Sequence, residues 1–274
     1  MTDISVIIPW CDREELGHTL RANSKYFEES AAEVIVVNCG GDERLLRRLL
    51  PAGGEHPPRV VGVPVSFNKS LAINVGAHAA RGRHMMILDA DILFRHNLLA
   101  ELRAALAPSS FLTVADVVET GESVEGTGTY LKSTTARREF MLADGRRIEI
   151  VTSRVFFPAR SRKGPGLLFL RREDFVAVGG MNSDLTGWGW EDNDVAARLQ
   201  MALDLEPLEA GSAVHLSHAD DKRYFRDGLS RADNDELNFM ACLARYERGL
   251  IHGTLAADVR YWETLTRGAA PQDS

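Results

Sequence analysis

Asp89 and Asp91 stand two positions apart, directly after a short apolar run, with Ala90 between them. Carboxylates at this spacing at the end of a strand can point into one cleft and hold a hard divalent cation, which in turn binds a diphosphate. A helix-capping aspartate beside a loop aspartate gives the same pattern without that chemistry. These three residues alone therefore do not decide between a metal site and a structural role.

A pair of histidines, His215 and His218, is the second candidate. Two imidazoles at this spacing can reach one metal ion where the backbone turns, although a lone buried histidine is more often a core residue. One aspartate with two histidines suits Mn²⁺, with diphosphate oxygens completing an octahedron. We therefore expect a metal site if the fold brings the histidines to Asp91.

The third candidate is the segment 187–194, which reads Gly-Trp-Gly-Trp-Glu-Asp-Asn-Asp. Its glycines allow unusual backbone angles, and its tryptophans offer flat faces on which sugar rings stack. Acidic residues at the start of a helix also stabilise the helix dipole without any catalytic role. Because a cap does not need two exposed-looking tryptophans, we interpret the segment as functional.

The fourth candidate is Phe-Asn-Lys-Ser at 67–70, followed by Asn-Val-Gly at 74–76. Asparagine, lysine and backbone N–H groups at the start of a helix can bind a nucleotide phosphate. A capped amphipathic helix accounts for the same residues. On its own this motif is a weak signal.

The elements that must position these residues alternate in type along the first third of the chain. Apolar runs predict buried strands at 4–9, 33–38, 59–63 and 84–88. Helical patterns lie between them at 14–27, from Asp42 to about 51, and after Ser66, which we expect to cap its helix. This order predicts an α/β fold with an open, mostly parallel sheet and helices on both faces, whose ligands bind at the carboxyl ends of the strands.

The pattern weakens over 119–147, which we interpret as a long loop or hairpin. Regular patterns return as a strand at 167–170 and as helices near 172–178, 191–201 and 234–249. No repeat or linker is visible. We therefore expect one domain over 1–274, with a nucleotide-binding half to about 110, an acceptor and metal half to about 230, and C-terminal helices.

Composition limits the class of protein. The chain has 274 residues, of which 45% are hydrophobic and 26% charged, and its formal net charge is −7. This balance excludes a disordered chain, and the acidic excess argues against nucleic-acid binding. No apolar run is long enough for a membrane helix, and no signal peptide is recognisable. The three scattered cysteines favour a reducing cytoplasm over a disulfide framework or a zinc cluster.

The four candidate segments occur in the order typical of the β-1,4-galactosyltransferases and their bacterial relatives in glycosyltransferase family 2. The chain resembles this family from Val6 to about Lys222, apart from residues 119–160, which match poorly. The most specific match is 187–194, similar to Gly-Trp-Gly-Gly-Glu-Asp-Asp-Asp. Residues 89–91 match the family's Asp-Val-Asp metal motif. His215 and His218 fall where the family has a metal-binding Met-x-x-His or a similar pair. Residues 7–13 resemble its Pro-aromatic-x-Asn-Arg loop, and 67–76 its Phe-Asn-Arg and Asn-Val-Gly motifs.

The resemblance implies a GT-A fold, in which a Rossmann-like half adjoins a smaller acceptor-side region. It also implies a metal-dependent, inverting transfer of a hexose such as Gal or GalNAc from a UDP-sugar to a hydroxyl of a glycan or small molecule, as in polysaccharide biosynthesis. The implied site residues are Asp91, His215 and His218 as ligands of Mn²⁺ or Mg²⁺; Pro9, Arg13, Phe67, Lys69, Asp89 and Ala90 around the uridine diphosphate; Trp188 beside the sugar; Asp192 as the catalytic base; and Glu191 as its support.

The chain also departs from the family's pattern. Trp190 and Asn193 stand where the animal enzymes have glycine and aspartate, on the acceptor side, and Lys-Gly-Pro-Gly at 163–166 replaces a stretch linked to donor choice. Donor sugar and acceptor therefore stay open, as do peripheral membrane contact and the oligomeric state. Two other functions remain: a sugar-nucleotide nucleotidyltransferase, whose glycine-rich N-terminal loop is missing, and a catalytically silent carbohydrate- or nucleotide-binding module.

Overall fold

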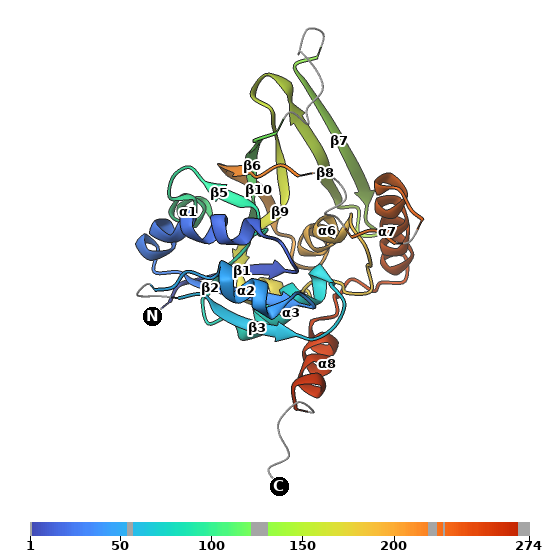
Figure 1. Ribbon diagram of the computed structural model, residues 1–274. Helices are drawn as coiled ribbons and strands as arrows, with labels where there is room; N and C mark the ends of the chain where they lie inside the picture. Colours follow the sequence, from blue (N-terminus) through green and yellow to red (C-terminus); the bar gives the residue numbers. More distant parts are fainter. Residues whose placement is uncertain (1, 54–56, 122–130, 219–223, 227, 268–274) are drawn as a thin grey trace.

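The first half of the chain forms four parallel strands with helices between them. The computed structural model describes residues 2–53, 57–121, 131–218, 224–226 and 228–267 (Figure 1). Its first elements are β1 (Ile4–Trp10), α1 (Glu15–Glu29), β2 (Glu33–Cys39), α2 (Glu43–Leu49), β3 (Arg59–Val63), α3 (Lys69–Ala79) and β4 (His84–Ile87). The strands lie in the order β3-β2-β1-β4, all parallel.

The strands β1 and β2 are apolar because both faces of the sheet are covered. Along β1, Val6 and Ile8 pack into a core cluster with Leu16 and Leu20 of α1. The intervening Ile7 packs into a second cluster, which contains the buried side chains of α3. A strand buried on both faces loses the alternation of polar and apolar residues, so the uninterrupted run predicted it correctly.

The second half adds six strands and five α-helices among the described residues. They are β5 (Ile92–Phe94), α4 (Leu98–Ala105), β6 (Ser110–Glu119), β7 (Ser133–Met141), β8 (Arg147–Phe156), β9 (Ser161–Arg171), α5 (Arg172–Ala177), α6 (Glu191–Leu203), β10 (Glu206–His215), α7 (Arg231–Tyr246) and α8 (Leu255–Arg267). The full order is β3-β2-β1-β4-β9-β6-β10-β5. The predicted α/β class is confirmed, and the sheet becomes mixed beyond β4 because β9 runs antiparallel to both β4 and β6.

Three local predictions need correction. Asn68, not Ser66, caps α3, because its side chain accepts a hydrogen bond from the backbone N–H of Leu71. Asp89–Asp91 leads into the short strand β5, so the two aspartates do not cap a helix there. The sequence pattern also missed β10 and α8. By contrast, Asp42 caps α2 as predicted.

The region 119–147, predicted as a loop or hairpin, contains β7 and the turn that leads into β8, its antiparallel partner, while 122–130 lies outside the described residues. Figure 1 shows this hairpin rising from the body of the molecule, with the 3₁₀ turn Phe157–Ala159 near its far end. β8 joins the main sheet only through Val155 and Phe156, which pair with the start of β9. Within the described part of the chain, no helix is long and apolar enough to cross a membrane.

Candidate active site

A cavity of about 200 Å³ opens at the carboxyl ends of β1 and β4. It takes side chains from loops on both halves of the chain, as expected for a ligand site of an open α/β sheet. Of the residues predicted from the sequence, Asp192 alone is not part of its wall. The wall includes Pro9, Arg13, Phe67, Lys69, Asp89, Ala90, Asp91, Trp188, Glu191, His215 and His218.

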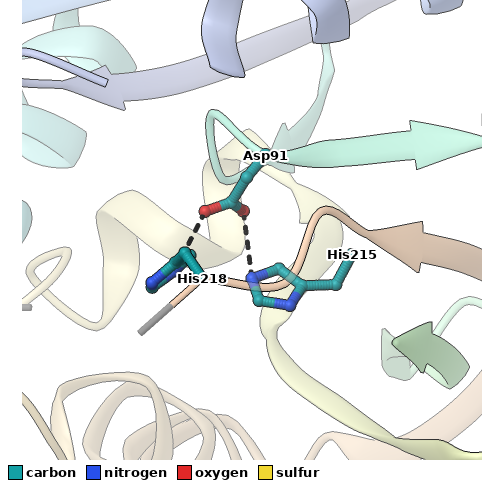
Figure 2. Close-up of side chains that lie close together, drawn as sticks. All are labelled: Asp91, His215 and His218. Atoms are coloured by element: carbon teal, nitrogen blue, oxygen red, sulfur yellow. Dashed lines mark ion pairs between the residues drawn. The ribbon is translucent and has the colours of Figure 1, made fainter. Parts of the chain in front are cut away.

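The structure brings Asp91, His215 and His218 together (Figure 2). His215 is the last residue of β10 and pairs with Ile92, so the antiparallel register places it beside Asp91. The Nε2 atoms of His215 and His218 lie 3.6 and 3.5 Å from the two Asp91 carboxylate oxygens. One ligand atom from each residue lies within 4.8 Å of the others, which suits a single cation.

Glu119, which the sequence did not single out, fixes the orientation of His215. Its Oε2 lies 2.6 Å from His215 Nδ1, and Ser217 Oγ and Arg162 Nε donate to the same carboxylate. Because Nδ1 is engaged, Nε2 is the nitrogen that faces Asp91. A carboxylate behind a histidine is the usual partner of a metal ligand, so these residues fit a bound Mn²⁺ or Mg²⁺. Glu119 was missed because the sequence predicted a loop from residue 119 onward, whereas this residue ends β6 and pairs with His215 of β10.

The charges around His215 determine its protonation without a metal. Burial favours the neutral imidazole, but Asp91 and Glu119 outweigh it and raise the pKa of His215 to about 9. Burial also opposes ionisation of Glu119, yet hydrogen bonds from His215 and Ser217 lower the pKa of Glu119 to about 2. Arg13 donates to Asp91 Oδ2 at 2.5 Å. The carboxylates therefore attract positive charge at this position.

Lys69 lies among three carboxylates at the other side of the cavity. Its Nζ is 3.1 Å from Asp192 Oδ2, 3.3 Å from Asp89 Oδ1 and 4.0 Å from Glu191 Oε1. The carboxylate of Asp192 lies against Gly166, where a Cβ atom would collide with it. A residue larger than glycine at 166 would therefore displace either Asp192 or the strand.

Burial shifts the ionisation of the two acids on α6. It raises the pKa of Asp192, although the nearby ammonium of Lys69 works in the opposite direction. Burial, with repulsion from Asp192, raises the pKa of Glu191 to about 7. One Glu191 oxygen, Oε2, is buried without a hydrogen-bond partner among the described residues. A raised carboxyl pKa in a cleft is typical of a site that moves protons.

The loop before α6 is held by two buried asparagines of α7. Asn234 Nδ2 donates to the carbonyl of Trp188 at 2.7 Å, and Asn238 Nδ2 donates to that of Gly189 at 2.8 Å. Both asparagine side chains are fully buried. Gly187, Gly189 and Trp190 all have positive φ, so the loop does not form the hydrogen bonds of a regular helix or strand. The two asparagine side chains supply donors for its carbonyl groups instead. The helical pattern of 234–249 alone gave no sign of this contact.

The two tryptophans of this loop differ in their surroundings. Trp188 lines the cavity, and the guanidinium of Arg231 lies 4.2 Å from its ring centre. Trp190 is 2% exposed and packs edge-on against Phe239, so the expectation of two exposed tryptophans was wrong for Trp190. Its backbone φ of 65° is one that glycine adopts without strain.

The remaining motif residues divide into cavity walls and structural contacts. Phe67 packs against Tyr224 with ring centres 4.6 Å apart and ring planes tilted by 35°, and both side chains line the cavity, as Pro9 does. Asn74 instead lies in the core, where its side chain bonds the backbone of Met181 and the carboxylate of Asp258. The Asn-Val-Gly part of the motif therefore anchors α3 to α8 and does not reach the cavity.

Comparisons with known proteins agree with this geometry. The family model described as glycosyl transferase family 2 matches residues 5–163, more than half of the chain, and one described as N-terminal domain of galactosyltransferase matches 146–219. Among solved structures, a mutant of Drosophila β-1,4-galactosyltransferase 7 in complex with manganese, UDP-Gal and xylobiose matches with a TM-score of 0.50 and 17% identity, over 87% of this chain and 79% of that one. This likeness shows the GT-A fold. No curated protein matches the chain.

Proposed function

We propose that this chain, which belongs to glycosyl transferase family 2, uses a divalent metal ion and a UDP-sugar donor to glycosylate a hydroxyl group. The observation that carries the proposal is the convergence of Asp91, His215 and His218 in the wall of a cavity that also contains Lys69, whose ammonium group is paired with Asp192. The structurally similar Drosophila enzyme was crystallised with manganese and UDP-Gal, which supports the same pair of ligands here.

The donor would lie along the cavity wall. The aromatic rings of Phe67 and Tyr224 offer apolar surface for the uracil ring, and Pro9 lines the same cavity. Arg13 and Lys69 supply positive charge for the diphosphate. A metal ion held by Asp91, His215 and His218 would stabilise the negative charge that develops on the departing UDP. Trp188 would border the sugar, as its place in the wall allows.

Asp192 is suited to be the general base. It would accept the proton of the acceptor hydroxyl while that oxygen attacks the anomeric carbon, and the bond from that carbon to the diphosphate oxygen would break with its electrons leaving on UDP. Lys69 favours the ionised form that this role requires. One displacement inverts the anomeric centre, so an α-linked donor gives a β-linked product. A silent binding module would have no need of a buried base held in this way.

The same proposal includes the donor sugar, the acceptor and the cellular compartment. The match to galactosyltransferase models favours a hexose such as Gal or GalNAc, transferred to a glycan or small-molecule acceptor as in polysaccharide biosynthesis. All three cysteines, Cys11, Cys39 and Cys242, are free and buried. Reduced cysteines suit a cytoplasmic site of action.

The test is a screen of nucleotide sugars for metal-dependent release of UDP, combined with calorimetry of UDP binding. We expect one or more UDP-hexoses to release UDP only with Mn²⁺ or Mg²⁺, and UDP to bind far more weakly after chelation. Equal binding of UDP with and without metal would contradict the metal assignment, and release of nucleotide from GDP- or CDP-sugars alone would contradict the donor class.

A further inference from the structure

The far end of the β7–β8 hairpin exposes apolar side chains next to basic ones. We call residues 131–132 and 156–160 the hairpin tip; its two parts are joined by the hydrogen bond from the Phe157 N–H to the Lys132 carbonyl. Leu131 and Phe156 are 55% and 43% exposed. A single exposed apolar residue is ordinary, but a group of them at the end of a projecting hairpin is typical of an interaction surface (Figure 1).

The hairpin is the basic part of an acidic protein. Residues 131–163 contain nine Lys and Arg against three Asp and Glu, whereas the rest of the chain contains 23 against 36. Along the hairpin several arginines are ion-paired, among them Arg137 with Glu149 and Arg147 with Glu139. At the tip, Lys132 and Arg160 are exposed and form no ion pair with any described residue. The tip therefore presents positive charge that none of the described residues neutralises.

The tip is connected directly to the candidate active site. The Arg160 carbonyl accepts a hydrogen bond from the N–H of Glu119, the residue that orients His215. Two positions further along, Arg162 bonds the Glu119 carboxylate and lines the cavity. A surface that binds the tip would consequently lie close to the cavity.

We propose that the hairpin tip docks on an anionic lipid surface, with Leu131 and Phe156 entering the headgroup region and Lys132 and Arg160 contacting the lipid phosphates. Charge complementarity favours an anionic occupant, and the apolar side chains favour a bilayer over a dissolved polyanion, which offers no apolar phase for them. The docking does not depend on the identity of the donor. If the proposed transfer is correct, docking also positions the cavity for an acceptor carried by a lipid.

The experiment is co-sedimentation of the full chain with phosphatidylcholine vesicles, with and without phosphatidylglycerol, in the presence of chelator. We expect binding to the anionic vesicles alone, decreasing strongly when salt is raised from about 0.1 M to about 0.5 M. Binding should fall at least about tenfold in Phe156→Ser with Leu131→Ser, and likewise in Lys132→Glu with Arg160→Glu. The matched control, Arg44→Glu with Arg48→Glu on exposed positions of α2, should bind as the unaltered protein does.

Three results would overturn the proposal: no binding of the unaltered protein to anionic vesicles, equal binding to neutral ones, or an equal loss in the α2 control. Retention on immobilised heparin that is unaffected by Phe156→Ser, without vesicle binding, would show that the occupant is a dissolved polyanion. Calorimetry of UDP binding to each variant distinguishes a failure of this proposal from a failure of the proposed function. A variant that no longer binds vesicles but binds UDP normally has lost only the role of the tip.

Discussion

Lys69 Nζ and Asp192 Oδ2 lie 3.1 Å apart, and this ion pair connects the first turn of α3 to the first turn of α6. The two residues are separated by 123 positions in the sequence. Lys69 also contacts Asp89, so one ammonium group lies between the Asp-Ala-Asp motif and the proposed base, Asp192. Burial raises the pKa of Asp192, so the ionised form of Asp192 depends on its contact with Lys69.

Replacing Asp192 by asparagine tests its role as the base. The amide keeps the size of the side chain but cannot accept the acceptor proton, so transfer should fall by roughly 10²–10⁴-fold. UDP binding with metal, measured by calorimetry, should change little, because Asp192 is not part of the cavity wall. Full transfer activity in Asp192→Asn would exclude Asp192 as the base.

Replacing Lys69 by methionine should change the pH dependence of transfer. Lys69 lowers the pKa of Asp192 against the effect of burial, so its removal should raise that pKa further. Because the base must be ionised, the acid limb of the kcat profile should move to higher pH in Lys69→Met. The variant Lys69→Arg keeps the positive charge and should retain a limb close to the original. Equal profiles for Lys69→Met and the unaltered protein, at saturating donor, would show that Lys69 does not act on Asp192.

The sequence predicted the parts of the site that depend on short segments. A buried strand followed by Asp89-Ala90-Asp91 was visible as an apolar run and a motif, and the acidic start of α6 was visible in the same way. The strands β1, β2 and β4 were predicted as uninterrupted apolar runs because each is buried on both faces, and the partly exposed β3 was predicted from its β-branched residues. These features require no knowledge of how distant segments pair.

The parts that were missed depend on pairing between distant strands and helices. Glu119 meets His215 because β6 and β10 run in parallel register, and neither strand shows that register in its own pattern. Trp190 was misjudged because its burial comes from Phe239 on α7, a contact across 49 positions. Asn238 looked like any polar residue of an amphipathic helix. Packing between elements, rather than local propensity, decided all three.

Metal binding should depend on Asp91 and, more weakly, on Glu119. Asp91→Ala removes a ligand and should abolish the metal dependence of UDP binding in calorimetry. Glu119→Gln leaves the three ligands in place but weakens the hold on His215, and should reduce Mn²⁺ affinity about 10–100-fold. The exposed Glu236 of α7 offers a matched control, since Glu236→Gln should leave Mn²⁺ affinity unchanged. Tight Mn²⁺ binding in Asp91→Ala would place the metal elsewhere.

The asparagines of α7 should matter for substrate binding as well as stability. Asn238→Ala leaves the carbonyl of Gly189 without its donor and removes the acceptor of Arg226 Nη2, a loss of about 1–3 kcal/mol in the free energy of unfolding. We also expect a higher KM with a smaller change in kcat, because the loop that carries Trp188 loses a support. Leu237→Ala, at the neighbouring exposed position, is the control and should alter neither quantity. An unchanged KM in Asn238→Ala would limit its role to stability.

The raised pKa of Glu191 should appear in the stability of the protein. Folding raises the pKa of Glu191 to about 7, from the ordinary glutamate value of 4.5. Glu191 therefore favours the folded state fully at pH below the unfolded value, and this contribution is lost as pH rises through about 7. Glutamine resembles the protonated acid, so Glu191→Gln should unfold less readily than the unaltered protein at about pH 8 and nearly equally at about pH 4. The difference should be on the order of 3 kcal/mol.

The measurement is denaturant unfolding across this pH range with chelator present, so that metal binding does not contribute to the difference. Glu28→Gln, at an exposed position of α1, is the matched control and should show no pH-dependent gain. If Glu191→Gln is instead less stable than the unaltered protein at high pH, the fold favours the charged form of Glu191. The attraction of Lys69 would then outweigh burial in setting the pKa of Glu191. The sign of the change therefore distinguishes a buried acid held protonated from one held ionised by its lysine.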